Sequence, residues 1–224
     1  MLRSKMLRAS SGFEITPLAY EDTTVIGTSS DNGNSYSPSN NVSWNSRDTL
    51  IIFAQGRIAG SLTWNPASMT LTHTDGDSFT NFESIRSSGD FGSFVVAFLA
   101  TTGNSNIGTG TWSLNDNTTD EFANITLTAV RFSGSVGLKA SASAETGTNV
   151  SPTVASDSFV AAAAHSSLSA TNFTYSGATT VRSFFTNENG KGEVFVHSPT
   201  ETSPFTITES STTGVFVSVV LTPV

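Results

Sequence analysis

Acidic residues gather in short loops of this chain, where carboxylates could catalyse a reaction or bind a metal ion. Asp75 and Asp77 stand two residues apart in the segment HTDGD, and His73 comes just before them. Two carboxyl groups about 5 to 9.5 Å apart can hydrolyse a glycosidic bond, so this pair is a candidate hydrolase site. The simpler interpretation is a turn, because Asp-Gly is an ordinary turn sequence. We favour the turn and expect that the protein is not an enzyme.

The same kind of loop offers oxygen atoms to calcium, which prefers about six to eight oxygen ligands. Asp116, Asp120 and Glu121 lie in the segment NDNTTDE, and Asp31 lies in DNGN. None of these segments has the spacing of an EF-hand loop. We therefore predict no metal site and no cofactor, and we keep calcium as the alternative.

Tryptophan side chains could serve a different chemistry, the stacking of aromatic rings on sugars. The chain has three of them, Trp44, Trp64 and Trp112. Trp44 lies in the polar segment NNVSWNSRD, so we expect it to be the most exposed and name it as a possible ligand-binding residue. The alternative is that all three pack in the core or at its rim, because tryptophan is usually mostly buried.

Composition excludes several other kinds of site. The chain has no cysteine, which rules out disulfides, thiolate metal sites and a cysteine nucleophile. A net charge of −8 argues against nucleic-acid binding by the body of the protein. No apolar run is long enough to span a membrane. The histidines lack the spacing of metal ligands, and we expect each to be an ordinary strand residue: His73, His165 and His197.

The elements that would carry these residues are β-strands, because helical periodicity is nearly absent. Continuous apolar runs of strand length occur at 49–55 and 91–100, and the second should be buried on both faces. The run VAAAAHSS at 160–167 predicts a strand of small residues, with a helical turn as the alternative. The last run, GVFVSVVLTPV, should place alternate residues on opposite faces. We expect Val215, Val217, Val219 and Leu221 on one face, and Phe216 and Val220 on the other.

Turn signals separate about eleven or twelve such strands. This spacing predicts an all-β protein, an antiparallel β-sandwich of jelly-roll type over residues 20–224. The alternative is two stacked small domains, with an internal boundary near 141–152.

The segment MLRSKMLR begins a short extended arm at 1–19 that we expect to dock on a neighbouring subunit. Three of the chain's ten basic residues lie in these eight positions, whereas the whole chain carries eighteen acidic residues. Complementary charge would guide the arm, and its apolar side chains would anchor it. The predicted docking residues are Leu2, Arg3, Lys5, Met6, Leu7 and Arg8. The alternative is a tail without a role. The polar segment 9–17 is unlike the apolar part of a signal peptide, so we expect none.

Two motifs between residues 42 and 135 carry a resemblance. The first is Trp64-Asn65-Pro66 followed by Met69-Thr70, and the second is the strand end AVRFSG at 129–134. The order of these segments resembles that of β-sandwich, jelly-roll-like proteins of tailed bacteriophages. The final run GVFVSVVLTPV is similar to the closing strand of that group. Pro66 stands where the group usually has glycine.

The resemblance implies a component of the virion surface and brings no catalytic residues. We therefore predict a structural protein, a capsid decoration or cement subunit that attaches to a phage head and stabilises it. Its expected partners are the major capsid protein or other virion subunits, and it is expected to form a homotrimer made in the host cytoplasm. The alternative is a tail or fibre module that binds a glycan or receptor.

Overall fold

The predicted docking arm lies almost entirely outside the part of the chain that the structure describes. In this computed structural model the described residues are 17–30, 33–45, 48–59, 64–75, 78–88, 92–100, 110–118, 121–134, 136–144, 157–167, 173–176, 181–187, 190–199, 206–210 and 214–223. All six predicted docking residues, from Leu2 to Arg8, precede them, and the prediction for the arm stays a prediction.

The described residues form fifteen β-strands, one short 3-10 helix and no α-helix. Every pair of neighbouring strands is antiparallel, which confirms the all-β antiparallel prediction. The expected number of about eleven or twelve strands was too low, because several strands are short or rich in polar residues. The strands are β1 (Ala19–Ser29), β2 (Ser35–Tyr36), β3 (Asp48–Ala59), β4 (Thr70–His73), β5 (Ser78–Arg86), β6 (Ser93–Ala100), β7 (Trp112–Asn115), β8 (Glu121–Ser133), β9 (Val136–Ala144), β10 (Phe159–Ser166), β11 (Phe173–Ser176), β12 (Val181–Asn187), β13 (Gly190–His197), β14 (Thr206–Glu209) and β15 (Gly214–Pro223).

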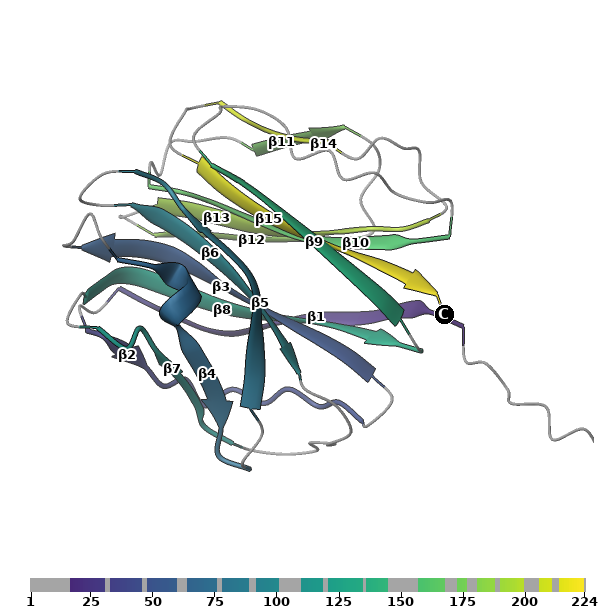
Figure 1. The fold of residues 1–224 in the computed structure, drawn as a ribbon, viewed down its shortest axis with the longest axis horizontal. Helices are drawn as coiled ribbons and strands as arrows, with labels where there is room; N and C mark the ends of the chain where they lie inside the picture. Colours follow the sequence, from purple (N-terminus) through teal and green to yellow (C-terminus); the bar gives the residue numbers. More distant parts are fainter. Residues whose placement is uncertain are drawn as a thin grey trace, which may run out of the picture.

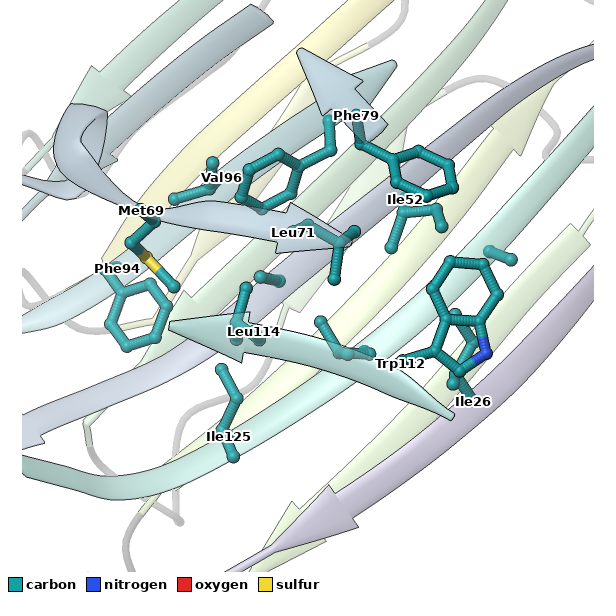
Figure 2. Close-up of a cluster of buried hydrophobic side chains, with 14 of the residues drawn as sticks. Ile26, Ile52, Met69, Leu71, Phe79, Phe94, Val96, Trp112, Leu114 and Ile125 are labelled. Carbon is teal, nitrogen blue, oxygen red and sulfur yellow. The ribbon is translucent and has the colours of Figure 1, made fainter. Parts of the chain in front are cut away.

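The first eight strands form one sheet in the order β1-β8-β3-β6-β5-β4-β7-β2. This sheet curls until it resembles a nearly closed barrel, so that β4 and β7 lie across the face of β3, β6 and β8 (Figure 2). The inner core is the cluster of apolar side chains enclosed by the curl. It includes Ile26, Trp44, Ile52, Trp64, Met69, Leu71, Phe79, Phe94, Val96, Trp112, Leu114 and Ile125.

A second sheet, in the order β12-β13-β10-β15-β9, covers the outer face of the curled sheet (Figure 1). The intersheet core fills the space between them. It includes Ile51, Phe53, Val95, Ala97, Val130, Phe132, Ala161, Ala163, Val194, Val196, Val215, Val217, Val219 and Leu221. The strands β11 and β14 form a third, two-stranded sheet over the far face of the second (Figure 1). The outer core lies beneath it and includes Val160, Ala162, Ala164, Phe173, Phe195, Ile207, Phe216 and Val220.

This layering confirms several predictions about single strands. The strand β6 supplies side chains to both the inner and the intersheet cores, so it is buried on both faces as expected. The alanine run forms β10, whose alternate alanines face two different cores. In β15 the odd-numbered residues from Val215 to Leu221 face the intersheet core, and Phe216 and Val220 face the outer core, as predicted.

The boundary near 141–152 begins inside a strand rather than in a linker. β9 ends at Ala144, and Ser141 to Ala144 pair with Val215 to Ser218 of β15. The remaining residues of that range lie outside the described part of the chain.

The motif at Pro66 has a local structural cause. Asn65 caps a 3-10 helix, Pro66–Ser68, because its Oδ1 accepts a hydrogen bond of 3.0 Å from the Ala67 amide. Proline suits the first position of such a helix, where its missing N–H is not needed. Met69 then enters the inner core and leads into β4.

Candidate functional site

The expectation of an exposed Trp44 is wrong, since only 4% of this residue is accessible to solvent. Its ring lies 5.9 Å from that of Trp112 and 6.3 Å from that of Phe79, measured between centroids. Ser43 and Asn45, the residues on either side of it, are exposed, whereas the indole fills the inner core. Trp64 is buried as well, so the stacking of these side chains on sugars has no support in this conformation.

Of the two carboxylates considered as a hydrolase site, the structure describes Asp75, whereas Asp77 lies outside the described residues. His73 is buried against the Trp112 ring, with 4.7 Å between the ring centroids. The Asp75 amide donates a hydrogen bond of 3.4 Å to His73 Nδ1, and the Asp75 carboxylate lies 3.6 Å from the same nitrogen. These contacts belong to the end of β4 and the turn that follows it.

Asp116 stabilises the bend that follows β7 through two hydrogen bonds from Thr118. Its Oδ1 accepts a hydrogen bond of 2.8 Å from the Thr118 amide, and its Oδ2 accepts one of 2.8 Å from the Thr118 hydroxyl. The next residue, Asn117, has a φ of 58° and donates to the Ser68 carbonyl at 2.6 Å. Among the described residues, no three histidine or acidic side chains are grouped as metal ligands. Asp31 and Asp120 lie outside that part of the chain.

The three histidines are strand residues, as expected. His73 lies in β4, His165 in β10 and His197 in β13.

An ion cluster closes one end of the inner core. Arg131 of β8 donates hydrogen bonds to Asp22 of β1 at 2.7 Å and 3.1 Å and to Asp48 of β3 at 3.2 Å. Hydrogen bonding to Asp22 raises the pKa of Arg131, and Asp48 adds to that effect. The Asp48 side chain is only 2% exposed and also accepts a bond from the Asn45 amide. One guanidinium thus joins three adjacent strands.

We predict that Arg131→Met lowers the free energy of unfolding by about 2 kcal/mol, because Asp48 loses a charged partner while buried. Chemical denaturation of both proteins near neutral pH measures the loss. Asp48→Asn should cost less in the Arg131→Met background than in the wild type, since it then removes an uncompensated charge. Equal losses in the two backgrounds would show that the pair is not coupled.

Sequence reasoning missed a group of polar side chains between the two large sheets, which we call the polar seam. Gln55 and Arg57 follow Phe53 along one face of β3. In the strand register Gln55 lies opposite Thr126 of β8, and Arg57 lies opposite Asn124 of β8 and Ser93 of β6. Every residue of the seam except Arg57 is fully or almost fully buried. The seam consists of Gln55, Arg57, Ser93, Asn124, Thr126, Thr128 and His165.

Gln55 bridges the two sheets across this seam. Its Nε2 donates hydrogen bonds to the Ala164 carbonyl of β10 at 2.9 Å and to the Glu193 carbonyl of β13 at 3.0 Å. The side chain therefore ties two strands of the second sheet to β3. This bridge lies at the boundary between the intersheet core and the polar seam.

His165 lies on the opposite wall of the seam and is fully buried. Neither of its ring nitrogens has a hydrogen-bond partner. Burial, with a further contribution from the charge of Arg57, lowers the pKa of His165 from 6.5 to about 3. The imidazole is consequently neutral at ordinary pH, and the structure favours that neutral form.

A second group of polar side chains lies on the outer face of the second sheet, beneath β11 and β14. Lys191 Nζ is 3.6 Å from Glu193 Oε1 and 5.9 Å from the centre of the Phe173 ring. Glu209 of β14 is buried and contacts Gly214, where a larger residue would meet its carboxylate. Both carboxylates are covered by protein, so a substrate would have to displace the two-stranded sheet to reach them.

Sequence signals for both groups exist but are weak. Gln55 and Arg57 interrupt the apolar run TLIIFAQGRIAG, and His165 ends a run of four alanines. Glu193 likewise precedes the apolar segment VFV. A polar residue inside an apolar strand indicates a partner across the core, but it does not identify that partner.

Comparisons with known proteins give no match, whether with family models, curated proteins or solved structures. Within the described residues no helix has the length and apolar character needed to cross a membrane.

Proposed function

We propose that this chain is a structural subunit of a virus particle, a capsid decoration or cement protein that attaches to a phage head. The observation that supports this best is the order of the first eight strands. In a jelly roll, two Greek keys interleave eight strands in two four-stranded sheets. The order β1-β8-β3-β6 followed by β5-β4-β7-β2 agrees with that arrangement, with the two halves joined between β6 and β5. Jelly rolls are common in viral capsid proteins.

The proposed mechanism is association rather than catalysis. Among the side chains that the structure describes, Val25 is the one large apolar side chain that is exposed, at 37%. Charged residues make up only 12% of the sequence, and hydroxyl and amide side chains are frequent. Neutral polar groups cost less to bury than charges, which favours contacts with neighbouring subunits. The arm at 1–19 would add an anchor on the major capsid protein, and the proposed assembly is a homotrimer on the virion surface.

The tail or fibre module that binds a glycan is the weaker proposal. It relied on an exposed Trp44, and that indole is part of the inner core.

Density-gradient sedimentation of a lysate of the source material tests the proposal, with the chain located by mass spectrometry. We expect it to migrate with a heavy particle. If it stays at the top of the gradient as a small oligomer, the assembly proposal is wrong.

A chain without residues 1–12 tests the arm separately. The deletion ends before β1 begins at Ala19, so the circular dichroism spectrum should not change. Attachment to particles should be lost. Wild-type occupancy by the truncated chain would refute the role of the arm and leave the particle proposal standing.

A further inference from the structure

We propose that the polar seam is an acid-sensitive joint, at which protonation of His165 loosens the second sheet from the curled sheet while the inner core stays folded. This device is independent of the proposed function, because it follows from the packing of the two sheets alone.

The interface between the two sheets is divided into an apolar part and a polar part. One part is apolar and consists of the intersheet core, with Phe53 and Ala163 on facing strands. The other part is the polar seam, in which Gln55 donates to carbonyls of β10 and β13. A polar interface separates at a lower cost than an apolar one, since water can replace its hydrogen bonds.

His165 lies in that seam without a group that could share a proton with it. The residue follows Ala161 and Ala163 along the inner face of β10 and is fully buried, and neither ring nitrogen has a hydrogen-bond partner. A neutral imidazole can be tolerated there, but a charged one would need a partner.

The groups that face His165 from the neighbouring strands carry no negative charge. From β3 it faces Arg57, whose positive charge disfavours protonation. The neighbouring strands present Gly192 of β13 and Val215 of β15 directly opposite it, and neither is charged. From β6 and β8 the described seam residues are the uncharged Ser93, Asn124, Thr126 and Thr128. Lys191 and Glu193 flank Gly192 and lie on the other face of the sheet, with the outer core.

Protonation inside the closed joint would therefore place an imidazolium and a guanidinium together in a medium of low polarity. An exposed His165 takes up a proton near its ordinary pKa of 6.5, whereas burial and Arg57 lower the pKa in the closed joint to about 3. Below pH 6.5 the open form thus binds more protons, and opening becomes more favourable by about tenfold per pH unit until about pH 3. Near pH 4.5 the open fraction should be about 100 times that near pH 7.5.

Hydrogen exchange of the full chain, followed by mass spectrometry and corrected for intrinsic rates, tests the proposal. The strands β10 and β13 pair only within the second sheet, so their amides should exchange faster when that sheet loses the cover of the curled sheet and frays. Near pH 4.5 they should lose protection by up to about 100-fold, while the amides of β4 and β7 keep theirs. Trp44, Trp64 and Trp112 all lie in the inner core, so tryptophan fluorescence should not change. Unchanged protection of β10 in acid, or simultaneous opening of β4 and β7, would overturn the joint.

Two variants and a matched control identify the group responsible. His165→Leu should abolish the acid response, whereas Arg57→Met should change it little near pH 4.5, because burial lowers the pKa of His165 more than the charge of Arg57 does. His197→Leu replaces another buried histidine of the same sheet, opposite Val160 on the outer face, and should respond as the wild type does. An undiminished acid response in His165→Leu would refute the assignment. If that variant does not fold, His165→Phe, which keeps a buried ring and cannot be protonated, makes the same test, and an undiminished acid response in it refutes the assignment.

Discussion

Replacing Trp112 with alanine should lower the free energy of unfolding by about 4 kcal/mol, one of the two largest losses we expect. The indole is fully buried in the inner core and contacts aromatic rings from three other segments. Its ring centroid lies 4.7 Å from that of His73, 5.4 Å from that of Phe79 and 5.9 Å from that of Trp44. Alanine would leave a cavity whose walls belong to a curled sheet and cannot easily collapse. Urea denaturation followed by circular dichroism measures the loss.

Trp112→Phe is the matched control, because it keeps an aromatic ring in the same place. It removes the hydrogen bond of 3.1 Å from Trp112 Nε1 to the Asn40 carbonyl, together with part of the side-chain volume. We expect a loss of about 1 to 2 kcal/mol. A loss below about 1 kcal/mol for Trp112→Ala would contradict the packing of the inner core.

This expectation also changes how tryptophan variants bear on function. A fall in glycan binding after Trp44→Ala would normally be taken as a lost sugar contact. Because Trp44 packs against Trp112, the same fall would follow from a damaged fold. A binding experiment on these residues therefore needs a stability measurement beside it.

The strands that sequence reasoning located best are those whose composition is determined by burial. β6 and β15 are apolar on both faces, and their alternation is visible in the sequence alone. The distribution of strands among three sheets was not visible. A strand buried between two layers has the same apolar pattern whichever layers cover it, so the pattern does not reveal the neighbours.

The missed polar seam has a related cause. Gln55 and Ala164 are 109 positions apart, and their contact depends on how two sheets are stacked. Sequence periodicity reports which way a residue faces on its own strand, and it contains no information on the facing sheet. The prediction for Trp44 failed in the opposite direction. Its polar neighbours in the sequence indicated that it is exposed, but the indole itself is buried.

Gly56→Ala is the other substitution for which we expect a large effect, a loss of about 3 kcal/mol. Gly56 lies in the middle of β3, opposite Ile125 of β8. A methyl group there would collide with the Asn124 carbonyl oxygen and would lie 3.1 Å from the Ile125 Cα. These are backbone atoms of the adjacent strand, so no side-chain rotation can relieve the contact. The adjacent strands β3 and β8 would have to separate.

Gly33→Ala provides the control, because a methyl group at Gly33 would meet only the Ser35 carbonyl oxygen at 3.7 Å. That variant should be neutral or slightly more stable, since alanine reduces the conformational freedom of the unfolded chain. Thermal denaturation of both variants compares the two sites under the same conditions. Equal stability of Gly56→Ala and Gly33→Ala would show that β3 and β8 do not approach each other as closely as this arrangement requires. A selective loss in Gly56→Ala would instead support the close pairing of β3 and β8, on which the inner and intersheet cores both depend.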